Sequence, residues 1–141
     1  MVSYNQQSGI SDAPSYQVSG VPYATASFTV PVSGSTPIAI NFPMVAKFVT
    51  VVNTHSGTNA ALRVGFSANG INGAVNNNYF TLDNGDSYTG ECRIASILLL
   101  SDTTTDQTSA SVIAGLTGIA STSVPGFAVG TLNWSGSDGV G

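Results

Sequence analysis

Charged residues are scarce in this chain of 141 residues. They make up 7% of it, whereas ordinary soluble proteins carry about 25%. Only Lys47, Arg63 and Arg93 are basic, and the formal net charge is −4. Nucleic-acid surfaces and polybasic membrane patches both need clustered Lys and Arg, because these residues neutralise phosphates. The composition therefore excludes direct nucleic-acid binding and a polybasic membrane patch.

Long apolar runs are missing as well. The longest one in the body of the chain is Ile97–Leu100, and a membrane-spanning helix needs about 20 apolar residues. The first residues show neither the basic nor the apolar region of a secretory signal. We therefore expect that the chain does not insert into a membrane and that it is made without a signal peptide.

The residue types that usually perform catalysis are rare. His55 and Cys92 are the single histidine and the single cysteine, so neither a zinc ligand set nor an internal disulfide is available. No G-x-S-x-G motif accompanies the histidine. His55 is expected to be exposed in a loop, and Cys92 to be a small core residue or a partly covered neighbour of Arg93. These observations predict that the chain is not an enzyme and has no catalytic, cofactor-binding or metal-binding residue.

The stretch 78–93 concentrates acidic residues, with Asp83, Asp86 and Glu91 inside nine positions. Their spacing does not fit an EF-hand, although a calcium site completed by Asn76–Asn78 or by distant loops stays open. Paired carboxylates for glycoside hydrolysis need a cleft, which a tight turn does not offer. The Asn84–Gly85 step predicts a type I′ β-hairpin with a solvated tip, and we favour this interpretation.

Alternating apolar residues are abundant, whereas no apolar repeat of 3.6 residues reaches helical length. Turn signals recur every eight to twelve residues, which favours a β-sandwich or jelly roll over a helical or α/β fold. The pattern predicts eight strands, at 27–32, 37–42, 47–53, 61–67, 78–82, 87–101, 109–119 and 126–134.

The apolar residues at alternating positions of these strands should face inward and form the hydrophobic core. It should contain Phe28, Val30, Ile38, Ile40, Phe42, Phe48, Leu62, Val64, Phe66, Phe80, Ile94 and Leu98.

The sequence divides into an N-terminal arm at 1–22, a β domain at 23–134 and a C-terminal tail at 135–141. The arm is polar and almost uncharged, with Tyr4 and Tyr16 in it, and is expected to lie on another molecule. Interface cores are depleted in charge, so the charge-poor composition favours a subunit whose flanks are covered. A secreted β domain would share this composition, and glycosylation of the sequon at Asn133 is left open.

Several phrases between Leu62 and Ile119, "LRVGFSANGIN", "NYFTLDNGDSYTGECRIASILLL" and "ASVIAGLTGI", carry a family resemblance. This part resembles the single jelly-roll capsid proteins of large icosahedral double-stranded DNA viruses, above all their penton and related minor capsid proteins. The resemblance implies an all-β fold, an eight-stranded antiparallel β-sandwich or barrel with terminal arms. It also implies a pentamer at the fivefold vertex of the virion, beside major and minor capsid proteins, without catalytic residues. The compact chain has no inserted domain that would imply host attachment.

An alternative function is a carbohydrate-binding or adhesin-like β-sandwich, because jelly rolls also form lectins and a fold does not fix a function. Tyr79 and Tyr88 flank the acidic turn and could stack on a sugar ring. Their positions within strands suit packing equally well.

Overall fold

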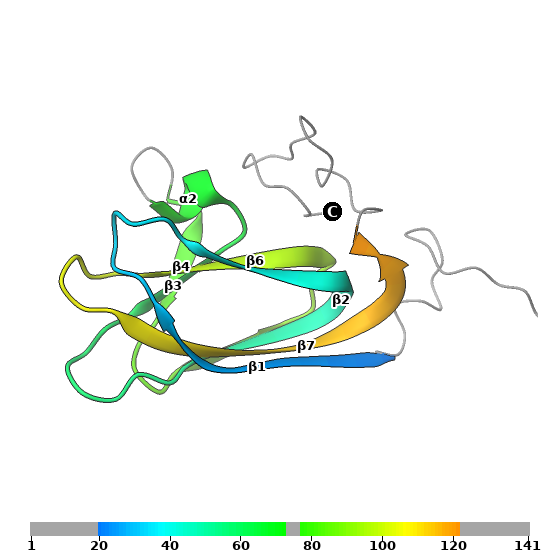
Figure 1. Ribbon diagram of the computed structural model, residues 1–141, viewed down its shortest axis with the longest axis horizontal. Helices are drawn as coiled ribbons and strands as arrows, with labels where there is room; N and C mark the ends of the chain where they lie inside the picture. The colour runs from blue at the N-terminus through cyan, green and yellow to red at the C-terminus, as the bar shows by residue number, and fades with distance from the viewer. Residues whose placement is uncertain (1–19, 73–76, 122–141) are drawn as a thin grey trace, which may run out of the picture.

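The computed structural model describes residues 20–72 and 77–121 of the chain (Figure 1). The described part is almost entirely β-structure, so the predicted all-β class is confirmed. Its elements are β1 (Val21–Val30), β2 (Ile38–Asn53), β3 (Leu62–Gly65), α2 (Ala68–Asn72), β4 (Tyr79–Leu82), β5 (Ser87–Gly90), β6 (Ile94–Ser101) and β7 (Thr108–Ala120).

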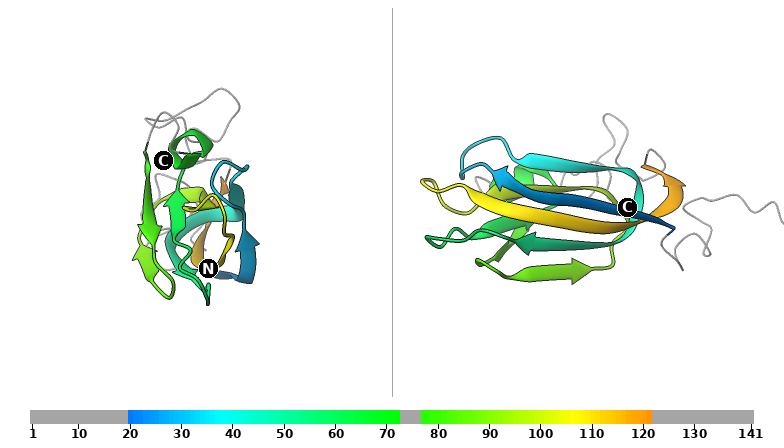
Figure 2. Two further views of the ribbon diagram at one scale, coloured as in Figure 1. Left: turned by 90° about the vertical axis from the view of Figure 1, so that its left-hand side faces the viewer. Right: turned by 60° about the horizontal axis from the view of Figure 1, so that its bottom comes forward.

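Seven strands form one antiparallel sheet in the order β1-β7-β2-β6-β3-β4, with β5 paired to β2 outside this path. Figure 2 shows β1 running beside β7 at the edge of the sheet. Within the described residues no ladder joins β1 to β4, so the sheet is open and the predicted barrel closure is absent.

The longest strand, β2, bends and serves two parts of the sheet (Figure 1). Residues 38–41 pair with β6, whereas 49–52 lie between β5 and β7. The ladder with β6 skips from Asn41 to Ala46, and this gap contains Pro43, which has no N–H to donate. The sequence pattern predicts two strands here, at 37–42 and 47–53, and the structure corrects them to one bent strand.

The opposite correction applies to 87–101, which the pattern predicts as one strand. It is divided into β5 and β6 by a link at 91–93. The reason is a change of partner, because β5 pairs with the second half of β2 and β6 with its first half. The described residues thus hold seven strands instead of eight, and the predicted strand at 126–134 lies outside them.

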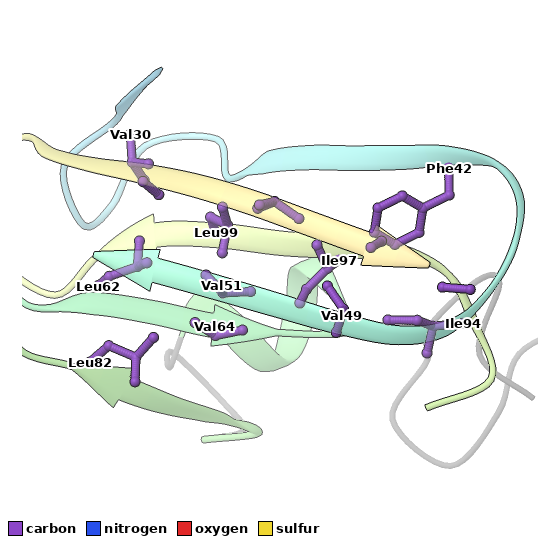
Figure 3. Packing of buried hydrophobic residues seen from close by; sticks show 14 of the residues in the cluster. Val30, Phe42, Val49, Val51, Leu62, Val64, Leu82, Ile94, Ile97 and Leu99 are labelled. Atoms are coloured by element: carbon purple, nitrogen blue, oxygen red, sulfur yellow. The ribbon is translucent and has the colours of Figure 1, made fainter. Parts of the chain in front are cut away.

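Side chains from both ends of the sheet share one hydrophobic core, with residues of β1 and β7 packed against residues of β3, β4 and β6 (Figure 3). Of the predicted core residues, five are fully covered: Val30, Phe42, Leu62, Val64 and Ile94. Four are partly buried against this core: Phe28, Ile40, Phe66 and Phe80. Three are only half-buried and lie outside the core cluster: Ile38, Phe48 and Leu98.

A short helix, α2, occurs where the sequence predicts only a loop. Ser67 caps it, because its Oγ accepts a hydrogen bond from the Gly70 N–H at 2.9 Å. A Cβ at Gly70 would lie 2.7 Å from this oxygen, so the capped turn has room only for glycine. Ile71 is fully buried, and this one side chain anchors a helix that is too short to show an apolar repeat.

The N-terminal end of the described chain is joined to β7, where the Gly20 N–H donates to the Leu116 carbonyl at 3.1 Å. Because β1 begins at Val21, the last two residues of the predicted arm, 21 and 22, belong to the sheet. The rest of the arm up to residue 19 lies outside the described residues, and so do the C-terminal tail and Asn133.

Candidate functional site

The acidic turn between β4 and β5 is solvent-exposed at Asp83 and Asp86, and Glu91, also exposed, lies beyond β5 in the link to β6. The turn is closed by the Asp86 N–H, which donates to the Asp83 carbonyl at 2.9 Å. Gly85 has a φ of 84°, whereas no described residue other than glycine has a positive φ. A type I′ turn needs positive φ at both central residues, so that prediction is wrong. Positive φ at the third residue alone fits a type II turn.

The predicted hairpin is wrong as well, because β4 pairs with β3 while β5 pairs with β2. The Asn84 amide explains the turn in another way. Its Oδ1 accepts from the Ala60 N–H at 3.0 Å, and its Nδ2 donates to the Thr58 carbonyl at 3.4 Å. The Asn-Gly step therefore ties the turn to the β2–β3 loop instead of joining two paired strands.

The asparagines considered for a calcium site precede β4, which begins at Tyr79. Asn78 donates its N–H to the Gly70 carbonyl beside α2, Asn77 is exposed, and Asn76 lies outside the described residues. In the part of the chain that the structure describes, no group of three or more His, Cys, Asp or Glu side chains could hold a metal ion.

A buried asparagine that the sequence reasoning missed organises this end of the molecule. Asn53, at the end of β2, is 0% exposed and uses its whole amide. Its Nδ2 donates to the Ala60 carbonyl at 3.1 Å and to the Leu82 carbonyl at 3.0 Å. Its Oδ1 accepts from the His55 N–H at 3.0 Å and from the Thr108 hydroxyl at 3.2 Å. One side chain thereby joins β2, β4, β7 and the β2–β3 loop.

His55 lies two positions after this asparagine and is half-buried, so the prediction that it is exposed is wrong. Cys92 is a free thiol, half-buried against the hydrophobic core, which fits the structural role expected of it.

The two tyrosines considered for sugar stacking both contact other side chains of this chain. The Arg63 guanidinium lies 4.5 Å from the ring centroid of Tyr79. The Tyr88 ring lies 4.7 Å from that of Phe80, centroid to centroid, and also packs on the core. Arg63 further joins Asp102 at 2.6 Å and donates to the Ile71 and Asn72 carbonyls, so it fixes α2 to the sheet.

Burial raises the pKa of the Tyr88 hydroxyl, and the adjacent Cys92 raises it further through electrostatic repulsion and a hydrogen bond. The neutral phenol is therefore favoured in the folded state. Its contribution to stability is complete below the ordinary pKa of 10.0 and is lost as the pH rises through the higher folded-state value.

We accordingly expect Tyr88→Phe to flatten the alkaline loss of stability, since phenylalanine cannot ionise. Phenolate absorbance, followed during an alkaline titration of both proteins, should also lose its latest component in the variant. Unchanged alkaline unfolding, or a titration curve that loses an earlier component instead of the latest one, would contradict this assignment.

A shallow hollow of about 490 Å³ lies between the β1–β2 loop and α2. Its lining is uncharged and consists of Gly34, Ser35, Thr36, Pro37, Ala68 and Asn72. It brings together segments about 30 positions apart in the sequence, and its lining holds no side chain of the kinds that usually serve as general acid or base.

The sheet surface formed by β1, β7, β2 and β5 presents a second uncharged area. One row across it joins Ala24, Ile113, Thr50 and Thr89, and the next joins Ser111, Val52 and Ser87. We call these seven residues the outer face. Alternation along β7 sends Ile113 away from the core, where Val112 and Ala114 are buried.

Two large hydrophobic side chains are exposed in the described part of the molecule. They are Ile113, at 48% of its surface, and Val21, at 37%. An isoleucine surrounded by hydroxyls and small residues is a feature that the sequence reasoning missed. The sequence did contain a signal for it, because the alternation along this strand places Ile113 at a position that should face outward and be polar.

No helix in the described ranges has the length and apolar character needed to cross a membrane. Comparison with protein-family models and with curated proteins finds no match for this chain.

Proposed function

We propose that this chain is a structural subunit of a viral capsid, the penton at a fivefold vertex, built as a single jelly roll. The observation that carries the proposal is the strand order. When the two halves of β2 are taken as separate strands, one group runs β1-β7-β2-β5 and the other β2-β6-β3-β4. These groups correspond to strands 1-8-3-6 and 2-7-4-5 in chain order, the interleaving of two Greek keys in a jelly roll.

The distribution of charge supports an assembly role. The outer face and the hollow carry no ionisable side chain, and the chain as a whole has only three basic residues. Interface cores are depleted in charge, because a buried charge must be desolvated and paired. A subunit covered by neighbours accommodates such surfaces without this cost.

The number five and the partners come from the family resemblance between Leu62 and Ile119. By that resemblance the subunit forms a cyclic pentamer in the virion, in contact with major and minor capsid proteins. No specific observation favours the carbohydrate-binding alternative, since the Tyr79 and Tyr88 rings both contact side chains of this chain.

Negative-stain electron microscopy of the purified chain tests the proposal. We expect ring-shaped particles with fivefold symmetry, because a heterologous contact that closes makes a ring. Class averages with twofold or sixfold symmetry would contradict the vertex assignment. Binding to a glycan array without ring formation would favour the carbohydrate-binding alternative.

Removal of residues 2–19 tests the expected docking of the N-terminal arm. Pairing of the sheet begins at Gly20, so the deletion leaves every described contact in place. We expect a nearly unchanged melting temperature and weaker incorporation into shells of the major capsid protein, because the arm docks only where a neighbour provides a surface. A large drop in melting temperature would instead make the segment part of the folded core, and unchanged incorporation would remove its role in assembly.

A further inference from the structure

The outer face and the hollow lie on opposite sides of the molecule. Figure 1 shows α2, which borders the hollow, on the side away from β1 and β7. One surface has a protruding apolar side chain, Ile113, and the other has a recess without charge. These are two different flanks of one subunit, as a heterologous contact between copies requires.

We propose that Ile113 of one copy inserts into the hollow of a second copy, between its β1–β2 loop and α2. The inference rests on the proposed function and deepens it, because it names the two flanks that meet. When the rotation between successive copies closes, repetition of this contact gives a ring, in which each copy offers its outer face to one neighbour and its hollow to the other.

The absence of charged side chains on both surfaces points to a second copy of this chain as the occupant. Around Ile113 the outer face has only hydroxyl-bearing and small apolar side chains, and a charged partner surface would leave its charges buried and unpaired there. The lining of the hollow, from Gly34 to Pro37 and at Ala68 and Asn72, likewise offers no counter-charge. Each surface therefore suits the other better than it suits an ordinary charged protein surface.

The expected size of the contact agrees with a ring instead of isolated pairs. Four strands at about 4.8 Å spacing, over the roughly four residues that two outward rows span at about 3.4 Å each, give a face of about 260 Å². This is about a third of the roughly 800 Å² per partner that a standard stable interface covers. A single contact should therefore be weak, and a closed ring, in which every copy makes two, should dominate over the dimer.

Sedimentation velocity at micromolar concentration, on full-length chains, tests the contact. Ile113→Lys should weaken assembly by at least about tenfold, because it places an unpaired charge in the recess. Ile113→Val and Asn59→Lys should stay within about threefold of the original chain, since the first keeps an apolar side chain and the second adds the same charge to an exposed loop elsewhere. Ile113 is exposed, so melting temperatures should barely differ.

A second substitution tests the recess itself. Ala68→Glu adds a charge at the first residue of α2, where an acidic residue is favourable for a helix, and should weaken assembly alone. The double variant Ile113→Lys with Ala68→Glu should recover part of the assembly, and high salt should remove this recovery.

Three results would overturn the contact. Normal assembly of Ile113→Lys would overturn it and leave the proposed ring intact. A double variant no better than the weaker single variant would show that Ile113 and the hollow do not meet. A wild-type chain that stays monomeric at every concentration would overturn both the contact and self-assembly in the proposed function.

Discussion

Replacement of Asn53 by leucine is expected to lower the free energy of unfolding by about 3 kcal/mol or more. The amide is fully buried and makes four hydrogen bonds, to the Ala60 and Leu82 carbonyls, the His55 N–H and the Thr108 hydroxyl. Each buried polar group left without a partner costs about 1–3 kcal/mol. Leucine has a similar volume, so the loss reports the hydrogen bonds and not a cavity. Urea denaturation measures it.

Thr108→Val is the matched control, because it removes one partner of Asn53 and keeps the shape of the side chain. The Thr108 hydroxyl also lies 2.8 Å from the Ala60 carbonyl, whose other partner is the Asn53 amide. We expect a smaller cost, about 1 kcal/mol, since one hydrogen-bonding group is lost instead of two. If Asn53→Leu costs no more than Thr108→Val, then Asn53 does not organise the loops at this end of the sheet.

Truncation of Leu99 to alanine is the other large effect that we expect. Leu99 lies in β6, which pairs with β2 on one side and β3 on the other, and its side chain is fully buried in the core. Such Leu→Ala changes cost about 2.7–5 kcal/mol. The preceding residue provides the comparison. Leu98 points to the other side of β6 and is half-buried, so Leu98→Ala should cost less than about 1.5 kcal/mol.

The same denaturation experiment measures both variants. It also distinguishes two registers of β6, because the sequence pattern selects Leu98 for the core and the structure selects Leu99. A larger cost for Leu98→Ala than for Leu99→Ala would show that the structural register is wrong.

The strands with clean alternation could be predicted from the sequence. Leu62 and Val64 flank Arg63, and both are buried while Arg63 turns outward to Asp102. In β7, Val112 and Leu116 alternate and are buried in the same way, although the predicted core names no residue of this strand. In these segments one face is apolar and the other polar, which is the only information that a period of two provides.

The phase of β6 could not be predicted, because the run Ile97–Leu100 is apolar on both faces. The second apolar face exists for a tertiary reason, since α2 packs on the outer side of β3 and β6 and Leu100 is fully buried. In β2 the irregular pairing between Asn41 and Phe48 shifts the alternation, and Phe48 falls on the outer side. The local sequence pattern shows neither the packing of α2 on β6 nor the irregular pairing in β2.

The candidate surfaces were partly visible in the sequence. Ile113 stands at an outward-facing position, where the alternation along its strand predicts a polar residue, and the low number of charged residues can be counted directly in the sequence. The hollow could not be predicted, because it forms only where the β1–β2 loop meets α2. Asn84 shows the same limit, since its amide bonds the β2–β3 loop across 24 positions of sequence.

Native mass spectrometry of the full-length chain at micromolar concentration tests the assembly role most directly. We expect a closed species of five chains, each of 14.3 kDa, with little dimer, trimer or tetramer, because only the closed ring satisfies both flanks of every copy. A stable dimer or hexamer, or a monomer at every concentration, would contradict a self-assembling fivefold vertex protein.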